Sequence, residues 1–470
     1  MMRASPVDAA FSLVPVCPSL VWRGGLPRGS GLLLRARSSD SSVSGAPTGA
    51  CLSISAGRSA LETIFERVAG LDVHKAQVTA CVRVPAAGSG RRADLAEFAT
   101  TVRGLVALRD WLEAHGVTHV AMEATGVYWQ PVWHVLEDAF ELTLCNARHV
   151  KQVPGRKTDV SDAAWLCQLM EAGLLRGSYV PPKPQRALRA LTRYRKTQIQ
   201  ERQREANRLH KALEDTGIKL DCVASDILGA SGRAMLDGLV AGTTDPSVLA
   251  ELAQGRLRAK LPQLREALEG RFEAHHALII GAILAHLDFL DEHIDRLSDA
   301  IEDQLGPFAT GVPLAATITG VAERTAQVMV AEIGTDMTRF PSAGHLASWA
   351  GRCPGNDQSA GTRRSGRRRK GSKWLAIALE EAALAATRTN GSYLQAQYRR
   401  LRPRIGHGRA IGAVQHSILI AYWHMFTTGE TYHDLGGDYY QRRDPERQIR
   451  RLVNQLERLG QRVVIEPAAA

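Results

Sequence analysis

The sequence predicts three successive regions: an α/β domain, a long helical spacer and a mainly α-helical C-terminal domain. Between residues 66 and 145, short β-branched or alternating runs are interleaved with amphipathic stretches. Charged, leucine-punctuated stretches dominate residues 185–305, and alanine-rich apolar stretches follow. The chain has 470 residues and a mass of 51.1 kDa, which is too long for one ordinary core and favours two or three domains.

Residues 1–65 differ in composition from the rest of the chain. They are rich in Ser, Gly, Pro and Ala, and they contain Arg but no Lys. Such a composition is typical of a transit peptide or a basic arm, and an extension from a wrongly chosen start codon explains it equally well. We exclude this segment from the fold and expect a disordered basic extension.

Seven elements are predicted in the first half of the α/β domain, which we place at residues 66–184. Polar His74 and Lys75 separate two runs of strand character, which indicates a hairpin. In chain order the elements are strands at 68–73, 76–84 and 96–101, a helix at 102–115, a strand at 118–122, a helix at 131–139 and a strand at 142–145. This is the ribonuclease-H order, in which the first strand is central and the fourth is its neighbour.

The remaining regions are predicted to be mostly helical. A basic loop at 148–157 precedes a helix at 159–172 and a proline-rich linker. The spacer, residues 185–305, has the pattern of a coiled coil or helical bundle. We assign residues 306–430 to the C-terminal domain and 431–470 to a tail. Within that domain we expect two short helices about Gly320 within residues 318–333, a basic loop at 352–373, and helices at 374–388 and 412–426.

The net charge of +11 indicates an anionic partner, because clustered Lys and Arg displace counterions from phosphates. A basic proteome background would give the same net charge, so the distribution matters. The dense basic segment between Arg363 and Lys373 favours nucleic acid. No apolar run approaches the roughly 20 residues of a membrane span. The dispersed cysteines form no C-x-x-C pair, which indicates reduced, structural thiols in a cytoplasmic protein. A DNA partner would make this protein nucleoid-associated.

Four acids on the predicted ribonuclease-H-like unit form a candidate metal site. Asp72 lies in the first strand, Glu123 ends the fourth, and Asp159 and Asp162 lie three residues apart at the start of a helix. Singly, each acid has an ordinary explanation as a turn residue, a cap or an N-terminal helix acid. Together they suit two hard divalent ions, Mg²⁺ or Mn²⁺, as phosphodiester cleavage requires.

A second candidate site is Ser359, which is followed by small Ala360 and Gly361 and then by the basic segment. Small neighbours let a phosphate approach the backbone, and a serine hydroxyl held there can attack phosphorus. From spacing alone, a nucleic-acid-binding loop in which Ser359 only contacts phosphate is the favoured interpretation. The candidate nucleic-acid-binding residues are Lys75, Arg156, Arg363, Arg364, Arg367, Arg368, Arg369, Lys370 and Lys373.

Five stretches of the chain resemble the DEDD-type insertion-sequence transposases, which have a RuvC-like N-terminal domain and a serine-bearing C-terminal domain and are described as bridge-RNA-guided recombinases. They are AGLDVHKAQVTACV, VAMEATGVYWQPVWHVLED, NARHVKQVPGRKTDVSDAAWLCQLMEAGLL, ITGVAERTAQVMVAEIG and RFPSAGHLASWAGRCPGNDQSAGTRRSG. The resemblance implies that Asp72, Glu123, Asp159 and Asp162 bind metal and that Ser359 links transiently to DNA. It also implies a structured RNA encoded by the element, and a homodimer or tetramer.

The chain departs from the family pattern at two motifs. The family commonly has Ser-Gly-Gly where this chain has Ser359-Ala360-Gly361, and Pro-Gly-Ile-Gly at a helix–hairpin–helix turn where this chain has Thr319-Gly320-Val321-Ala322. Two rival functions stay open: a RuvC-like nuclease that cuts with water alone, and a non-catalytic nucleic-acid-binding relative. The intact acids argue against the non-catalytic relative. The intact serine argues against the nuclease that cuts with water alone.

Overall fold

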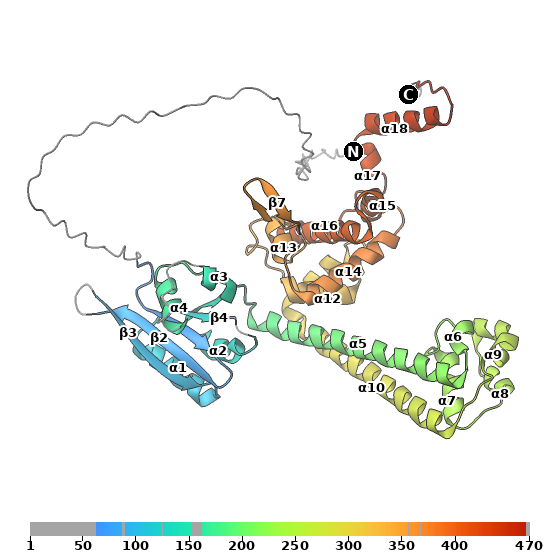
Figure 1. The fold of residues 1–470 in the computed structure, drawn as a ribbon, viewed down its shortest axis with the longest axis horizontal. Coiled ribbons are helices and arrows are strands. Elements are labelled where there is room, and N and C mark those ends of the chain that lie inside the picture. The colour runs from blue at the N-terminus through green and yellow to red at the C-terminus, as the bar shows by residue number, and fades with distance from the viewer. Residues whose placement is uncertain are drawn as a thin grey trace, which may run out of the picture. The chain divides into compact units, whose positions relative to one another are not determined.

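A computed structural model describes residues 63–86, 90–124, 126–152, 162–355, 357–366 and 368–466 (Figure 1). The predicted basic extension lies almost entirely outside the described residues. From Ile64 onward the chain forms one contact unit. None of the described helices combines the length and apolar character that a membrane span needs.

A five-stranded sheet with the order β3-β2-β1-β4-β5 forms the centre of the α/β region. Its strands are β1 (Val68–Val73), β2 (Gln77–Pro85), β3 (Arg91–Ala99), β4 (His119–Glu123) and β5 (Glu141–Cys145). β1 pairs antiparallel with β2 and parallel with β4, so the first strand is central and the fourth is its neighbour, as predicted. The third strand begins earlier than predicted, because an edge strand that pairs only with β2 tolerates the polar run at its start.

The two faces of the sheet bury different sets of side chains. Ala69, Leu71 and Val73 of β1 pack in a core with helices α1 (Val102–Ala114) and α2 (Trp129–Leu136). Val68, on the opposite face, packs with helix α4 (Asp162–Glu171). This alternation is the period-two pattern of a strand buried on both faces. A short helix not predicted from sequence, α3 (Ala147–Gln152), follows β5 within the expected basic loop.

Two long helices, α5 (Lys183–Thr216) and α10 (Ala274–Gln304), pack side by side and run in opposite directions (Figure 1). Arg195 of α5 donates to Ser298 of α10 at 3.3 Å, and near the other end Asp215 pairs with His276 at 3.4 Å. Small helices between them share a core with the end of α5. They are α6 (Leu220–Val223), α7 (Ala230–Val240), α8 (Pro246–Ala250), η1 (Gly255–Lys260) and α9 (Leu261–Ala267).

Among its described residues, the C-terminal region is helical except for one hairpin and the connecting loops. Its elements are η2 (Gly306–Phe308), α11 (Gly311–Ala316), α12 (Glu323–Ile333), α13 (Ala343–Trp349), β6 (Asp357–Ser359), β7 (Thr362–Ser365), α14 (Lys373–Arg388), α15 (Tyr393–Ile405), α16 (His407–Thr428), α17 (Tyr439–Arg442) and α18 (Pro445–Arg458). Leu188 of α5 belongs to the same core. Fully buried Tyr422 donates a hydrogen bond to the carbonyl oxygen of Gly334 at 2.9 Å.

Of the two helices predicted about Gly320, the first lies before the predicted range of 318–333. That helix, α11, ends at Ala316, and residues 317–322 form the turn. Gly320 has φ +87°, and a Cβ there would lie 2.4 Å from the carbonyl oxygen of Ala382 on α14. The left-handed backbone and the close approach of α14 both require glycine at this turn.

Candidate functional site

Strand register brings two of the predicted acids together. β1 and β4 are parallel, with Leu71 opposite Met122, so Asp72 and Glu123 occupy the next position on neighbouring strands. Alternation along each strand places Asp72 on the face of Val68 and Glu123 on the face of Ala121. Val68 and Ala121 both pack in the core that contains α4. Both acids therefore lie on the α4 side of the sheet.

Helix α4 brings the third acid to the same end of β1. Gly70 lies against α4 so closely that a Cβ on it would be 2.2 Å from the carbonyl oxygen of Ala163 and 2.5 Å from the amide nitrogen of Cys167. The Cys167 thiol donates to the carbonyl oxygen of Val68 at 3.4 Å. Since Ala163 faces Gly70 and Cys167 reaches back to Val68, α4 starts near the Asp72 end of β1. Asp162 is its first residue.

The surroundings of these acids are polar on one side and buried on the other. Asp72 is 27% exposed, and one of its oxygens lies 3.2 Å from Nε2 of the exposed His74. Glu123 pairs in register with Cys145 of β5. Burial, and then the charge of Glu123, raise the pKa of the Cys145 thiol to about 12. Cys145 therefore stays a neutral thiol beside the acids.

The structure groups these acids without closing a metal-ligand set. Within the described part of the chain, Asp72, Glu123 and Asp162 are not a group whose carboxylate oxygens all lie within 4.8 Å of one another. The fourth predicted ligand, Asp159, and the predicted phosphate contact Arg156 lie outside the described residues. Three carboxylates at one end of a sheet suit Mg²⁺ or Mn²⁺, which prefer oxygen ligands.

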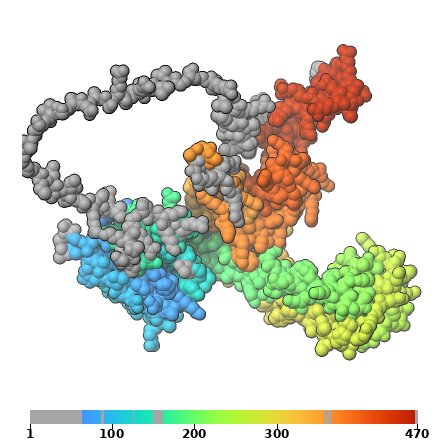
Figure 2. Space-filling model, in the orientation of Figure 1, coloured from blue at the N-terminus to red at the C-terminus, as the bar shows by residue number. Residues whose placement is uncertain are grey.

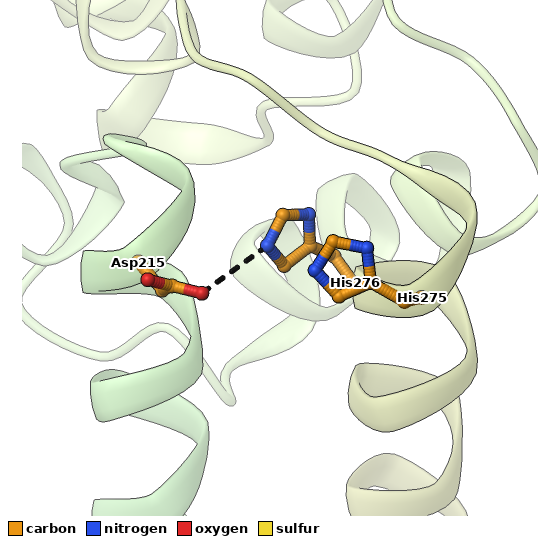
Figure 3. Close-up of side chains that lie close together, drawn as sticks. All are labelled: Asp215, His275 and His276. Carbon is orange, nitrogen blue, oxygen red and sulfur yellow. Dashed lines mark hydrogen bonds and ion pairs between the residues drawn. The ribbon is translucent and has the colours of Figure 1, made fainter.

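A separate group, Asp215, His275 and His276, has ligand atoms within 4.8 Å of one another, at the junction of α5 and α10 (Figure 3). The backbone amide of Glu273 donates to Nδ1 of His276 at 3.1 Å as part of a capping box. A neutral His276 that accepts there carries its proton on Nε2, which faces Asp215. A metal ion at Nε2 would have to displace that proton. The group is explained as a helix cap in which His276 also hydrogen-bonds to Asp215.

Ser359 ends β6, and two residues connect it to β7. Ser359 pairs with Thr362, so Ala360 and Gly361 form the turn, with φ of +48° and +77°. Positive φ at both central residues is the geometry of a type I′ turn. Among the residues that the structure describes, Ala360 is the one non-glycine with positive φ. The side chain of Ser359, like those of Arg363 and Arg364, lies outside the described part.

Two glycines close the neck of this hairpin. A Cβ on Gly351 would lie 2.5 Å from the carbonyl oxygen of Arg369, and a Cβ on Gly371 would lie 2.3 Å from that of Ala350. Between the neck and the strands, the amide of Gly355 donates to the carbonyl oxygen of Gly366 at 3.3 Å. The chain therefore leaves the helical core and returns to it through one narrow backbone contact.

An arginine at this neck, Arg352, was not among the residues predicted from the sequence. Arg352 donates to Oε1 of buried Gln415 on α16 at 3.1 Å. Burial, and then the positive charge of Arg368, lower the pKa of Arg352. Arg368 itself lies over Gly412 of α16. Two guanidinium groups that repel each other are suited to an anion between them. The position of Arg352 directly after Gly351 was the available signal.

Past the neck, Ser372 anchors the segment to the helical core. Its hydroxyl caps α14 and donates to Oε2 of Glu332 at 3.0 Å. Glu332 is 1% exposed and also accepts from Nε of Arg193 on α5 at 2.7 Å.

The predicted nucleic-acid-binding residues are mostly exposed where the structure describes them. Lys75, Arg368, Arg369, Lys370 and Lys373 are exposed, whereas Arg367 lies outside the described residues.

Two comparisons with protein families match separate parts of the chain. Residues 69–218 match a model of a DEDD transposase of the IS110 type. Residues 312–399 match the model of the IS116/IS110/IS902 family of transposases. The first match contains the four predicted acids, and the second contains Ser359. No curated protein matches the sequence.

Proposed function

Because the chain belongs to the IS110-type DEDD transposase family, we propose that it cuts and rejoins the DNA of a bacterial insertion sequence with an acidic metal site and a serine. The family implies a DNA-binding, DNA-cutting enzyme. The observation that carries the proposed metal site is the placement of Asp72, Glu123 and Asp162 at one end of the central strand, on one face of the sheet.

In this proposal the α/β region has a RuvC-like fold, and Asp72, Glu123, Asp159 and Asp162 hold divalent metal, Mg²⁺ or Mn²⁺, with two ions expected. Metal bound there supplies Lewis-acid stabilisation of charge on the phosphate oxygens. The chain's own part is to place the carboxylates on a rigid sheet and helix. Lys75 is exposed in the turn that follows β1, three residues after Asp72, where its ammonium group can neutralise a DNA phosphate.

Ser359 is the proposed nucleophile. Its hydroxyl oxygen bonds to a DNA phosphorus, one strand oxygen leaves and takes up a proton, and a hydroxyl of the strand to be joined later reverses the step. Arg352 and Arg368 at the hairpin neck, with the basic residues around them, neutralise the phosphate. The family resemblance supports a guide RNA encoded by the element and a homodimer or tetramer.

The test of the acidic site is DNA cleavage in Mg²⁺ with substrates that carry the ends of the element. Glu123→Gln should lower the cleavage rate by roughly 10³-fold, because metal-ion stabilisation of charge is worth several kcal/mol. The matched control is Glu141→Gln, at the start of β5, where the carboxylate is 77% exposed and pairs with His119. Its cleavage rate should stay at the wild-type value. Equal rates for all three proteins would refute the metal site.

A further inference from the structure

Helix α18 (Pro445–Arg458) is an amphipathic helix whose apolar side is uncovered. Ile449, Leu452 and Leu456 are 42%, 48% and 43% exposed. No residue of α18 is buried. In Figure 2 the red end of the chain projects from the orange-red helices on the face shown. The helix is nonetheless well formed at its start: Asp444 accepts from the amide of Arg447 at 3.1 Å, and Pro445 occupies the first turn.

The spacing of the apolar residues identifies what fits this face. Ile449, Leu452, Leu456 and Leu459 follow one another at intervals of three, four and three. This is the a/d spacing of a coiled-coil seam, to which Val453 at an e position adds one apolar residue. We propose that α18 pairs with α18 of a second copy of this chain.

The residues beside the seam also fit a second copy. In this register the e and g positions within the helix are Glu446, Gln448, Val453 and Gln455, and the one charged residue among them, Glu446, lies in the first turn before the seam begins at Ile449. Two copies therefore meet without like charges across the seam, in either orientation. The other charges lie on the opposite side, which carries Arg447, Arg450, Arg451, Glu457 and Arg458. A nucleic acid would bind that side and leave the apolar seam exposed.

The length of the helix sets the role of the pairing. Two heptads are too short for a stable coiled coil on their own, and they bury less than a standard protein interface. The α18 pair therefore strengthens contacts between copies that are already close. This role of the α18 pair rests on the proposed function, because joining two DNA ends brings copies of the enzyme together. The experiment uses no DNA, so its failure and the failure of the proposed function are distinguishable.

The test is sedimentation velocity of the full chain, freed of nucleic acid, over a range of concentrations. Leu452→Gln with Leu456→Gln should raise the dissociation constant for self-association by at least about tenfold, the effect of 1.4 kcal/mol. The control, Arg450→Gln with Arg451→Gln, changes the opposite side of the same helix and should leave the constant within about twofold. Unchanged association in the leucine variant, or equal losses in both, would overturn the proposal.

A second measurement is independent of other contacts between copies. Leu452→Cys, treated with a short bis-maleimide linker, should give more cross-linked dimer than the wild type, because d positions of paired helices are neighbours. Arg450→Cys, on the outer side, is the control. Equal yields from the two cysteine variants would contradict pairing through this seam.

Discussion

Asp72 and Glu123 lie on neighbouring strands of a five-stranded sheet, whereas Ser359 ends a strand of only three residues. The acids are placed by strand register and by α4, which packs on β1 with no space between. The serine is placed by a turn with a strained residue, a neck of two glycines, and hydrogen bonds from Arg352 and Ser372 to the helical core. The acidic site thus depends on the stability of a core, and the serine depends on local loop geometry.

The largest effect that the comparison predicts is at Gly70. Gly70→Ala places a Cβ into the backbone of α4 and should lower the free energy of unfolding by about 3 kcal/mol. DNA cleavage should be lost with it, because α4 carries Asp162. The control is Gly90→Ala, where the nearest atom to a new Cβ is 3.9 Å away. Chemical denaturation measures the free energy of unfolding of both variants. Equal values would contradict the close packing of α4 on β1.

The next effect concerns the anchor of the serine segment. Glu332→Gln removes the buried charge that pairs with Arg193 and accepts from Ser372, and should cost about 2 kcal/mol. Glu381→Gln is the control, since Glu381 is 52% exposed and its bond to Lys196 is worth less than about 1 kcal/mol. Thermal unfolding of the two variants should separate them. If Glu381→Gln is the more damaging change, Ser372 is not anchored as described.

The smallest effect is at the turn. Ala360→Gly should relieve about 1 kcal/mol of left-handed strain, because glycine adopts positive φ freely. Amide hydrogen exchange of the segment 352–372 should slow by about fivefold, the effect of 1 kcal/mol on a local opening. Gly361→Ala, at φ +77°, should speed exchange instead. Faster exchange in Ala360→Gly would contradict the strained turn.

The sheet was predictable because its strands alternate and are bounded by polar residues. The predicted central position of the first strand, beside the fourth, is confirmed by the pairing of β1 with β4. The sequence also indicated α14 and α16 through their alanine-rich and apolar character. These elements owe their form to burial, which leaves a periodic pattern in the chain.

The hairpin and the short helix α3 were not predictable for the opposite reason. Both lie in basic, glycine-containing segments with no apolar period. The backbone of the β6–β7 turn depends on φ at Ala360, a residue type that rarely adopts positive φ. Of the candidate residues, Asp72 and Glu123 followed from topology, whereas Ser359 was selected among nearby serines only by resemblance.

The most direct test of the proposed strand exchange is a search for covalent protein–DNA adducts on denaturing gels. Wild type and Ser359→Ala are compared in Mg²⁺ with the element's end sequences and flanking RNA. We expect a covalent adduct in the wild type that disappears in Ser359→Ala, while nucleic-acid binding persists because the arginines supply most of the affinity. Mg²⁺-dependent cleavage by both proteins with no adduct in either would contradict the proposed role of Ser359 as nucleophile. It would identify a nuclease that uses water.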